Sequence, residues 1–139
     1  MKFQRIDNLL FVRIDRGEEL LEALKTACLS AGVKLGAVSG IGATDDFTVG
    51  VYDTERRVYE PLSYTGAHEI VALVGNITTM NGEYYAHLHM SAADSTGRVV
   101  GGHLNRAVIS ATCELTVTTA NGSLERFRDE GSGLNRWDL

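Results

Sequence analysis

Three of the four histidines in this chain fall within residues 83–104, EYYAHLHMSAADSTGRVVGGHL. His87 and His89 are two residues apart, so a β-strand would direct both imidazoles to one face, with Cα atoms about 6 to 7 Å apart. Alternation predicts that strand, because Leu88 and Met90 form an apolar row opposite the histidines. A helix would point the two rings in different directions. The spacing therefore places two potential metal ligands side by side.

The third histidine of this stretch joins the other two only if the chain turns back on itself. Residues 94–97, Asp-Ser-Thr-Gly, have the composition of a turn and predict a β-hairpin. Simple pairing across that turn places His103 on the wrong face. A β-bulge at Gly101 and Gly102, where an extra residue costs least, would move His103 opposite His89. The three imidazoles would then converge.

Three neutral imidazoles on a rigid hairpin leave a fourth position for water or a ligand, which is the arrangement of an open divalent-metal site, with zinc preferred. The alternative is that His87, His89 and His103 are ordinary polar residues on a solvated face or donors to buried carbonyls. Ser91 and Glu114 are candidates for supporting the metal or transferring protons. Glu114 shares its predicted strand face with threonines, so it is otherwise a solvated carboxylate.

Length and composition define the class of protein. The chain has 139 residues and 44% hydrophobic content, which suits one domain spanning residues 1–139. Its net charge is −5 and no run of lysine or arginine occurs, which weighs against strong nucleic-acid binding. Neither a signal peptide nor a run of about 18 apolar residues is present, so we expect a soluble cytoplasmic protein with no membrane partner. Cys28 and Cys113 are expected to be small core residues.

Most of the chain has the pattern of β-strands, and one segment has the pattern of a helix. The helix is indicated by a stripe of apolar residues, by Asp15 and Glu18 at the spacing of a capping box, and by Gly32 at its end. We expect this helix to cover a sheet. The predicted strands outside the histidine hairpin are residues 2–6, 9–14, 33–38, 47–53, 58–64, 70–79, 107–119 and 123–128.

Several other residues invite a functional interpretation. Gly40 and Gly42 follow a predicted strand, but no helix follows them, so we interpret them as sites of close backbone packing rather than a phosphate loop. Arg13 is expected to be exposed, with the alternative that it holds an anionic group near a site. His68 is expected in a loop, as a surface histidine rather than a fourth ligand.

The C-terminal part of the chain is expected to contain one more alternating strand and a terminal segment of undecided structure. Residues 107–119 alternate, which predicts that Ala111 and Cys113 point inward. Residues 131–139, GSGLNRWDL, are expected to be either a flexible tail or an extension that docks through Leu134 and Trp137.

Several motifs in order make the chain resemble the plants-and-prokaryotes conserved domain family, called PPC or PCC, over residues 9–130. They are RIDRGEEL, the SGIGA loop followed by VGVYD, GAHEIVALVGNIT, HLHMSAAD, and GRVVGGHL leading to ATCEL. The resemblance implies an α+β fold, with a mostly antiparallel sheet curled into a barrel-like core and flanking helices, assembled as a homotrimer. It also implies that His87, His89 and His103 are the metal positions. His68 departs from the family, which usually has an apolar residue there.

The resemblance carries more than one functional interpretation. Plant members combine the domain with an AT-hook that enters the DNA minor groove, and bacterial relatives have inherited a DNA-binding label. This chain has no AT-hook segment, and an acidic domain would need a segregated basic patch to bind phosphates. A second interpretation is a metal-dependent enzyme, lyase or decarboxylase-like, or a small-molecule sensor, since the fold resembles acetolactate decarboxylase. A third is a structural trimer whose metal stiffens the hairpin. We expect a metal-binding homotrimer better suited to a small-molecule ligand than to DNA.

Overall fold

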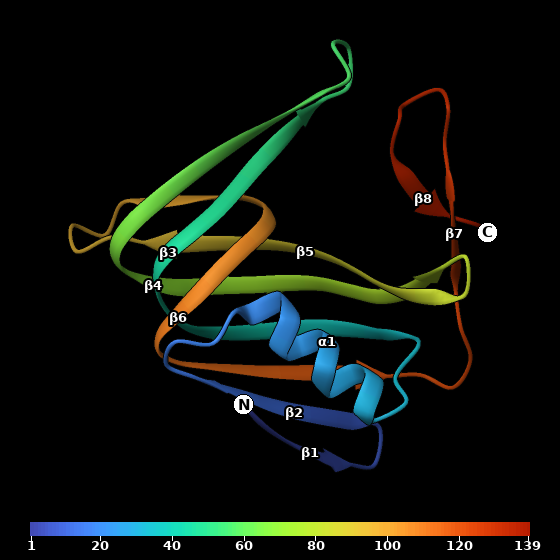
Figure 1. The fold of residues 1–139 in the computed structure, drawn as a ribbon, viewed down its shortest axis with the longest axis horizontal. Helices are drawn as coiled ribbons and strands as arrows, with labels where there is room; N and C mark the ends of the chain where they lie inside the picture. The colour runs from blue at the N-terminus through green and yellow to red at the C-terminus, as the bar shows by residue number, and fades with distance from the viewer.

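The computed structural model describes all 139 residues, as eight strands and one helix (Figure 1). In chain order the elements are β1 (Lys2–Ile6), β2 (Leu9–Asp15), α1 (Leu20–Ser30), β3 (Gly36–Asp53), β4 (Val58–Met80), β5 (Glu83–Ala93), β6 (Val99–Thr119), β7 (Glu125–Arg128) and β8 (Asn135–Trp137). No helix is both long and apolar enough to cross a membrane.

The sheet closes on itself through its four longest strands. Strand β3 pairs with β4 and β6, and β5 pairs with the same two strands, so β3, β4, β5 and β6 form a hydrogen-bonded ring. All of these pairings are antiparallel, whereas the short β7 joins β4 in parallel. The ring is not a full barrel. The expected curled, mostly antiparallel sheet is therefore confirmed, with a single helix beside it instead of several.

Helix α1 covers one face of the sheet and closes the core (Figure 1). Its buried side chains follow the helical repeat and pack with inward residues of the strands. They are Leu20, Ala23, Leu24, Ala27 and Cys28. Cys28 and Cys113 are both buried free thiols, and burial raises the pKa of each to about 12. Both cysteines are core residues, as predicted.

The two ends of α1 differ in how well the sequence predicts them. Gly32 has a φ of 68° and follows the helix, and the Val33 amide donates to the Cys28 carbonyl at 2.9 Å, which completes a Schellman ending. At the other end, Glu19 rather than Asp15 is the N-cap, because its carboxylate accepts from the Glu22 amide at 2.8 Å.

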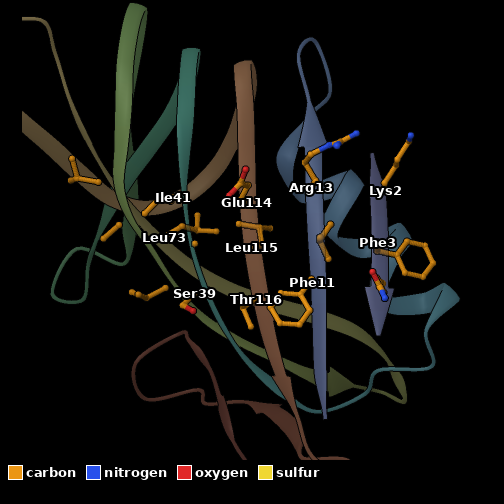
Figure 2. A pocket seen from close by; sticks show the side chains of 16 residues that line it. Lys2, Phe3, Phe11, Arg13, Ser39, Ile41, Leu73, Glu114, Leu115 and Thr116 are labelled. Atoms are coloured by element: carbon orange, nitrogen blue, oxygen red, sulfur yellow. The ribbon is translucent and has the colours of Figure 1, made fainter. Parts of the chain in front are cut away.

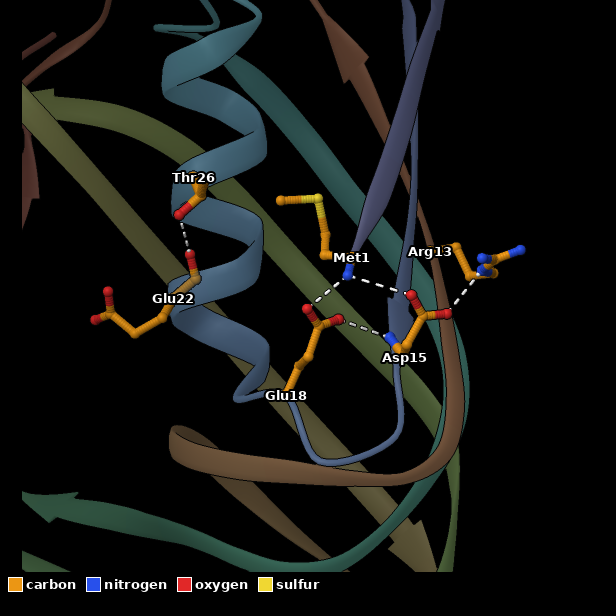
Figure 3. A network of polar contacts seen from close by, with 6 residues as sticks. All are labelled: Met1, Arg13, Asp15, Glu18, Glu22 and Thr26. Carbon is orange, nitrogen blue, oxygen red and sulfur yellow. Dashed lines mark hydrogen bonds and ion pairs between the residues drawn. The ribbon is translucent and has the colours of Figure 1, made fainter.

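The predicted capping box is only half formed. Glu18 accepts from the Asp15 amide at 2.8 Å, but the Asp15 carboxylate turns away to Arg13 and to the amino group of Met1 (Figure 3). Arg13 is half exposed and pairs with Asp15 at 2.9 Å, in agreement with the expected exposed position. This network joins the start of β1 to the segment that precedes the helix.

Two arms extend from the ring and face each other across a space (Figure 1). One arm is the outer hairpin of β3 and β4, where Asp53 pairs with Val58. The other is the C-terminal pair β7 and β8, joined by residues 129–134. Residues 131–139 therefore dock by strand pairing, while Leu134 and Trp137 stay 39% and 44% exposed.

Candidate metal centre

The β5–β6 hairpin brings His87, His89 and His103 together. His89 and His103 are direct partners across the two strands, and His87 lies two residues along β5 on the same face. One ligand atom from each of the three imidazoles lies within 4.8 Å of the other two. The ring centroids are 5.2 to 5.5 Å apart. The side chains converge as the hairpin pattern predicts.

The device that aligns His103 is not the predicted bulge. Pairing runs without interruption from Ala93 and Val99 to His89 and His103, so Gly101 and Gly102 do not bulge against β5. The turn instead contains five residues, 94–98, closed by a hydrogen bond from the Asp94 amide to the Arg98 carbonyl at 2.9 Å. One extra turn residue has the same effect on register as one bulged residue, since a shift of one changes the face of every side chain.

The two glycines serve a different purpose, which is close approach of neighbouring strands. A Cβ atom at Gly101 would lie 2.5 Å from the Met90 carbonyl oxygen, and one at Gly102 would lie 2.6 Å from that of Gly50. Gly40 and Gly42 have equivalent roles against β6, where a Cβ would lie 2.7 and 2.6 Å from carbonyl oxygens. The interpretation of these last two glycines as close packing positions is confirmed.

The separation of two of the imidazoles suits a shared ion. The Nε2 atoms of His87 and His89 are 3.3 Å apart. Two zinc–nitrogen bonds of about 2.0–2.1 Å at a tetrahedral angle place their nitrogens about 3.4 Å apart. The third ligand atom, on His103, lies within 4.8 Å of the other two. The three nitrogens thus fit a tetrahedral site with one open position.

Two of the three rings, His87 and His103, are held in the form that binds metal. Burial, together with neighbouring charge on His103, Arg126 and His89, lowers the pKa of His87 from 6.5 to about 4. Burial and the neighbouring His89 also lower the pKa of His103. Metal ligands must be deprotonated, so these rings present free electron pairs at neutral pH.

The histidines line a cavity of about 940 Å³ between the two arms. From the β3–β4 arm, Tyr59 packs edge-on against the His103 ring at 6.0 Å, and its hydroxyl donates to the His103 carbonyl at 3.2 Å and to Asn105. Burial raises the pKa of Tyr59, so the phenol stays protonated. Behind His87, Arg126 donates to Asn76, which is the strand partner of His87.

The other sequence-predicted candidates lie elsewhere. Glu114 is exposed on the outer face of β6, beside Arg13 of β2 and Ile41 of β3, and lines a separate hollow (Figure 2). Ser91 lies on β5 next to the histidines but does not line the cavity. Neither side chain joins the three imidazoles.

His68 is not in a loop, contrary to expectation. It lies within β4, half-buried, and its ring packs edge-on against Phe47 at a centroid distance of 5.1 Å. Its Nδ1 contacts the Gly66 carbonyl at 2.8 Å. It is not a member of the histidine cluster. An aromatic contact explains how this position accommodates a histidine where the family usually has an apolar residue.

Sequence reasoning missed the part of the cavity wall that comes from the C-terminal segment of the chain. Arg126, Arg128, Arg136 and Trp137 all line it. The available signal was three arginines and two aromatic residues among residues 125–137, in a segment interpreted as a strand and a tail. Nothing local indicates that this segment returns to the histidines.

The architecture and site define a class of protein: a β-rich domain with an open three-histidine cluster in a cavity. The chain belongs to the Plants and Prokaryotes Conserved (PCC) domain family, whose model matches residues 1–121. No curated protein matches it.

Three solved structures with the same fold illustrate what this chain is similar to. A "putative DNA binding protein" from Bacteroides thetaiotaomicron is 29% identical, with a TM-score of 0.96, and the match covers 99% of this chain and 96% of that one. A protein of the same description from Ralstonia eutropha is 27% identical, with a TM-score of 0.91 and coverage of 99% and 96%. A "metal-containing protein" from Archaeoglobus fulgidus is 28% identical, with a TM-score of 0.88, and each chain is covered completely.

Proposed function

We propose that this PPC-domain protein binds one divalent ion per subunit, zinc by preference, at His87, His89 and His103, and uses the open position to hold a small molecule. The observation that carries the proposal is the 3.3 Å separation of two Nε2 atoms within a three-imidazole cluster. An ion held by three protein ligands can polarise an oxygen of a bound molecule. The metal-containing relative supports the same assignment.

The surroundings favour an open site over a purely structural one. A structural zinc usually has four protein ligands, whereas this cluster has three and faces a cavity of about 940 Å³. Cavities of this size accommodate small molecules. The core of the ring lies on the opposite face of the hairpin, through Leu88 and Met90, so the fold does not depend on the ion for its apolar packing.

We also propose that the chain assembles as a homotrimer. An apolar patch covers the outer face of the sheet around the hollow in Figure 2, and it includes Phe3, Phe11 and Ile41, which are 42%, 41% and 61% exposed. Val71 and Val74 continue it at 48% and 53%. An apolar surface of this extent is typical of an interaction face, and Lys2, Arg13 and Glu114 around it offer both charges to a second copy.

DNA binding is the second candidate, favoured by the names of two relatives and by the arginines of the C-terminal arm. The net charge of −5 opposes it, because duplex affinity depends on neutralising phosphates. The basic residues also differ from those of a nucleic-acid surface, since Arg126 and Arg128 line the same cavity as the three histidines.

Metal analysis of two single variants tests the metal proposal. His89 is exposed and outside the core, so His89→Ala should keep the circular-dichroism spectrum while losing stoichiometric zinc. His68→Ala removes a histidine outside the cluster and is the matched control, which should retain zinc. Light scattering on the same samples should report three subunits for the wild type.

The outcomes separate the alternatives. Absence of stoichiometric metal after supplementation, or full retention in His89→Ala, rejects the metal site. Unfolding of the trimer on chelation would favour a structural ion over one that serves a ligand. A persistent monomer would reject the assembly proposal without affecting the metal site.

A further inference from the structure

The wall of the cavity opposite the histidines is positively charged. Arg126, Arg128 and Arg136 line it, and the lining contains no aspartate or glutamate side chain. All three arginines lie beyond residue 121, where the match to the family model ends. In an acidic protein this local excess of positive charge is a distinct feature of the C-terminal arm.

The charge on Arg126 is buried without an anionic partner. Arg126 is 6% exposed. Its guanidinium donates hydrogen bonds to Thr78 Oγ1 at 2.7 Å, Asn76 Oδ1 at 2.7 Å and the Asn135 carbonyl at 2.8 Å. All three acceptors are neutral. A buried charge is costly unless an opposite charge accompanies it. An anion in the adjacent cavity would supply that charge.

One of the other two arginines has free capacity for such an anion. Arg128 is exposed, takes part in no ion pair, and shares the face of the β7–β8 pair that carries Arg126. Arg136 lies on the other face, opposite Phe127, and contacts Asp129 at 3.4 Å. Guanidinium groups bind carboxylate and phosphate oxygens through two parallel hydrogen bonds. Arg126 and Arg128 therefore offer more donors at one face of the cavity than the protein itself uses.

The cavity is held open by contacts between its two arms. The Tyr52 hydroxyl donates to the Ser132 carbonyl at 3.1 Å, and Arg57 donates to the Gly131 carbonyl at 2.8 Å. On the inner side, the Arg126 guanidinium carbon lies 4.8 Å from the Tyr85 ring centre and 5.9 Å from that of Trp137. These contacts fix the arginine wall relative to the histidines before any ligand arrives, which reduces the ordering cost of binding.

We propose that the cavity binds a small organic anion, whose carboxylate or phosphate group contacts Arg128 beside the buried charge of Arg126 and whose other end extends toward the three histidines. Contact with a metal ion rests on the function proposed above, whereas the contacts with the arginines do not. The ligand class is thus set by the C-terminal arm.

The single tryptophan of the chain provides the assay, because Trp137 lines the cavity. Intrinsic fluorescence should change saturably on titration with succinate or glycerol phosphate and not with succinamide, the neutral analogue of succinate. Which of the two anions binds more tightly distinguishes a carboxylate from a phosphate ligand. The titrations are run on zinc-supplemented protein and on protein treated with a chelator.

The variant Arg128→Gln should weaken the preferred anion at least about tenfold, because a charge-assisted contact made through two hydrogen bonds is lost. Arg128 is exposed, so the fold should persist, whereas Arg126 holds three partners and is a poor choice for substitution. Arg136→Gln, on the opposite face of the same strand pair, should leave the affinity unchanged. Arg98→Gln, on the β5–β6 turn and outside the cavity, is the matched control.

Equal affinity for succinate and succinamide, an unchanged affinity in Arg128→Gln, or no saturable response to either anion overturns the inference. Zinc stoichiometry is measured independently on each sample. Anion binding without stoichiometric zinc supports this inference and rejects the metal proposal. Stoichiometric zinc without anion binding supports the metal proposal and rejects this inference.

Discussion

The strand that carries His87 and His89 lies so close to β4 that one methyl group should disturb both stability and the site. Gly75 pairs with Leu88, between the partners of the two histidines. A Cβ atom at Gly75 would collide with the His87 carbonyl oxygen and lie 2.8 Å from the Leu88 Cα. Both obstacles are backbone atoms, so the strands must separate rather than a side chain rotate.

The expected cost of Gly75→Ala is about 3 kcal/mol, the upper part of the range for overpacking in a well-packed interior. For a domain of this length that corresponds to a fall of about 10 °C in the melting temperature. Thermal unfolding followed by circular dichroism at a fixed protein concentration measures it. Because the His87 backbone must move, a zinc titration should also show weaker binding in the variant.

Gly131→Ala is the control for this substitution. The nearest atom to a Cβ at Gly131 is 3.7 Å away, an ordinary contact, and its φ is not positive. It should leave the melting temperature close to that of the wild type or raise it slightly by restricting the unfolded chain. A melting temperature for Gly75→Ala equal to that of this control would show that the close strand approach does not constrain the site.

Two further predictions concern protons and nucleic acid. In metal-free protein, burial and nearby charge lower the pKa of His87 from 6.5 to about 4, so the unfolded chain takes up a proton at this ring before the folded chain does. Its contribution to stability is therefore complete above pH 6.5 and declines as the pH falls toward 4; an NMR titration of the ring with a midpoint near 6.5 would contradict this. On the net charge of −5, we expect only weak, sequence-independent duplex binding at physiological salt, and tight binding with base preference in a fluorescence-anisotropy titration would refute the charge argument.

Local patterns predicted the elements that depend on local physics. The helix stops just before Gly32, which supplies the left-handed residue needed after it. Asn81 and Gly82, with φ of 54° and 77°, form a two-residue turn between β4 and β5, the turn type that an Asn-Gly pair favours. The shared face of His87 and His89 follows from alternation alone. These features need no knowledge of the rest of the chain.

Features that depend on strand register, or on contacts between residues far apart in the sequence, could not be predicted from local patterns. A five-residue turn and a four-residue turn with a bulge give His103 the same partner, so the sequence could predict the convergence but not its cause. Ala111, expected inward, is exposed, because β6 has two extra residues relative to β3 between Ile109 and Cys113. An irregularity of this kind interrupts the period of two on which the prediction relied.

The largest gap in the sequence-based analysis was the C-terminal arm, and the reason bears on how the site is organised. The arm returns to the cavity through a short parallel pairing of Thr79 and Met80 with Glu125 and Arg126, a contact that no local pattern signals. The three histidines lie inside the segment that matches the family and the arginine wall lies beyond it. Substitutions in the arm can therefore change the charge and shape of the cavity without touching the metal ligands or the ring. Under the two proposals made above, the hairpin would set the chemistry of the ion, and the arm would select the small molecule that reaches it.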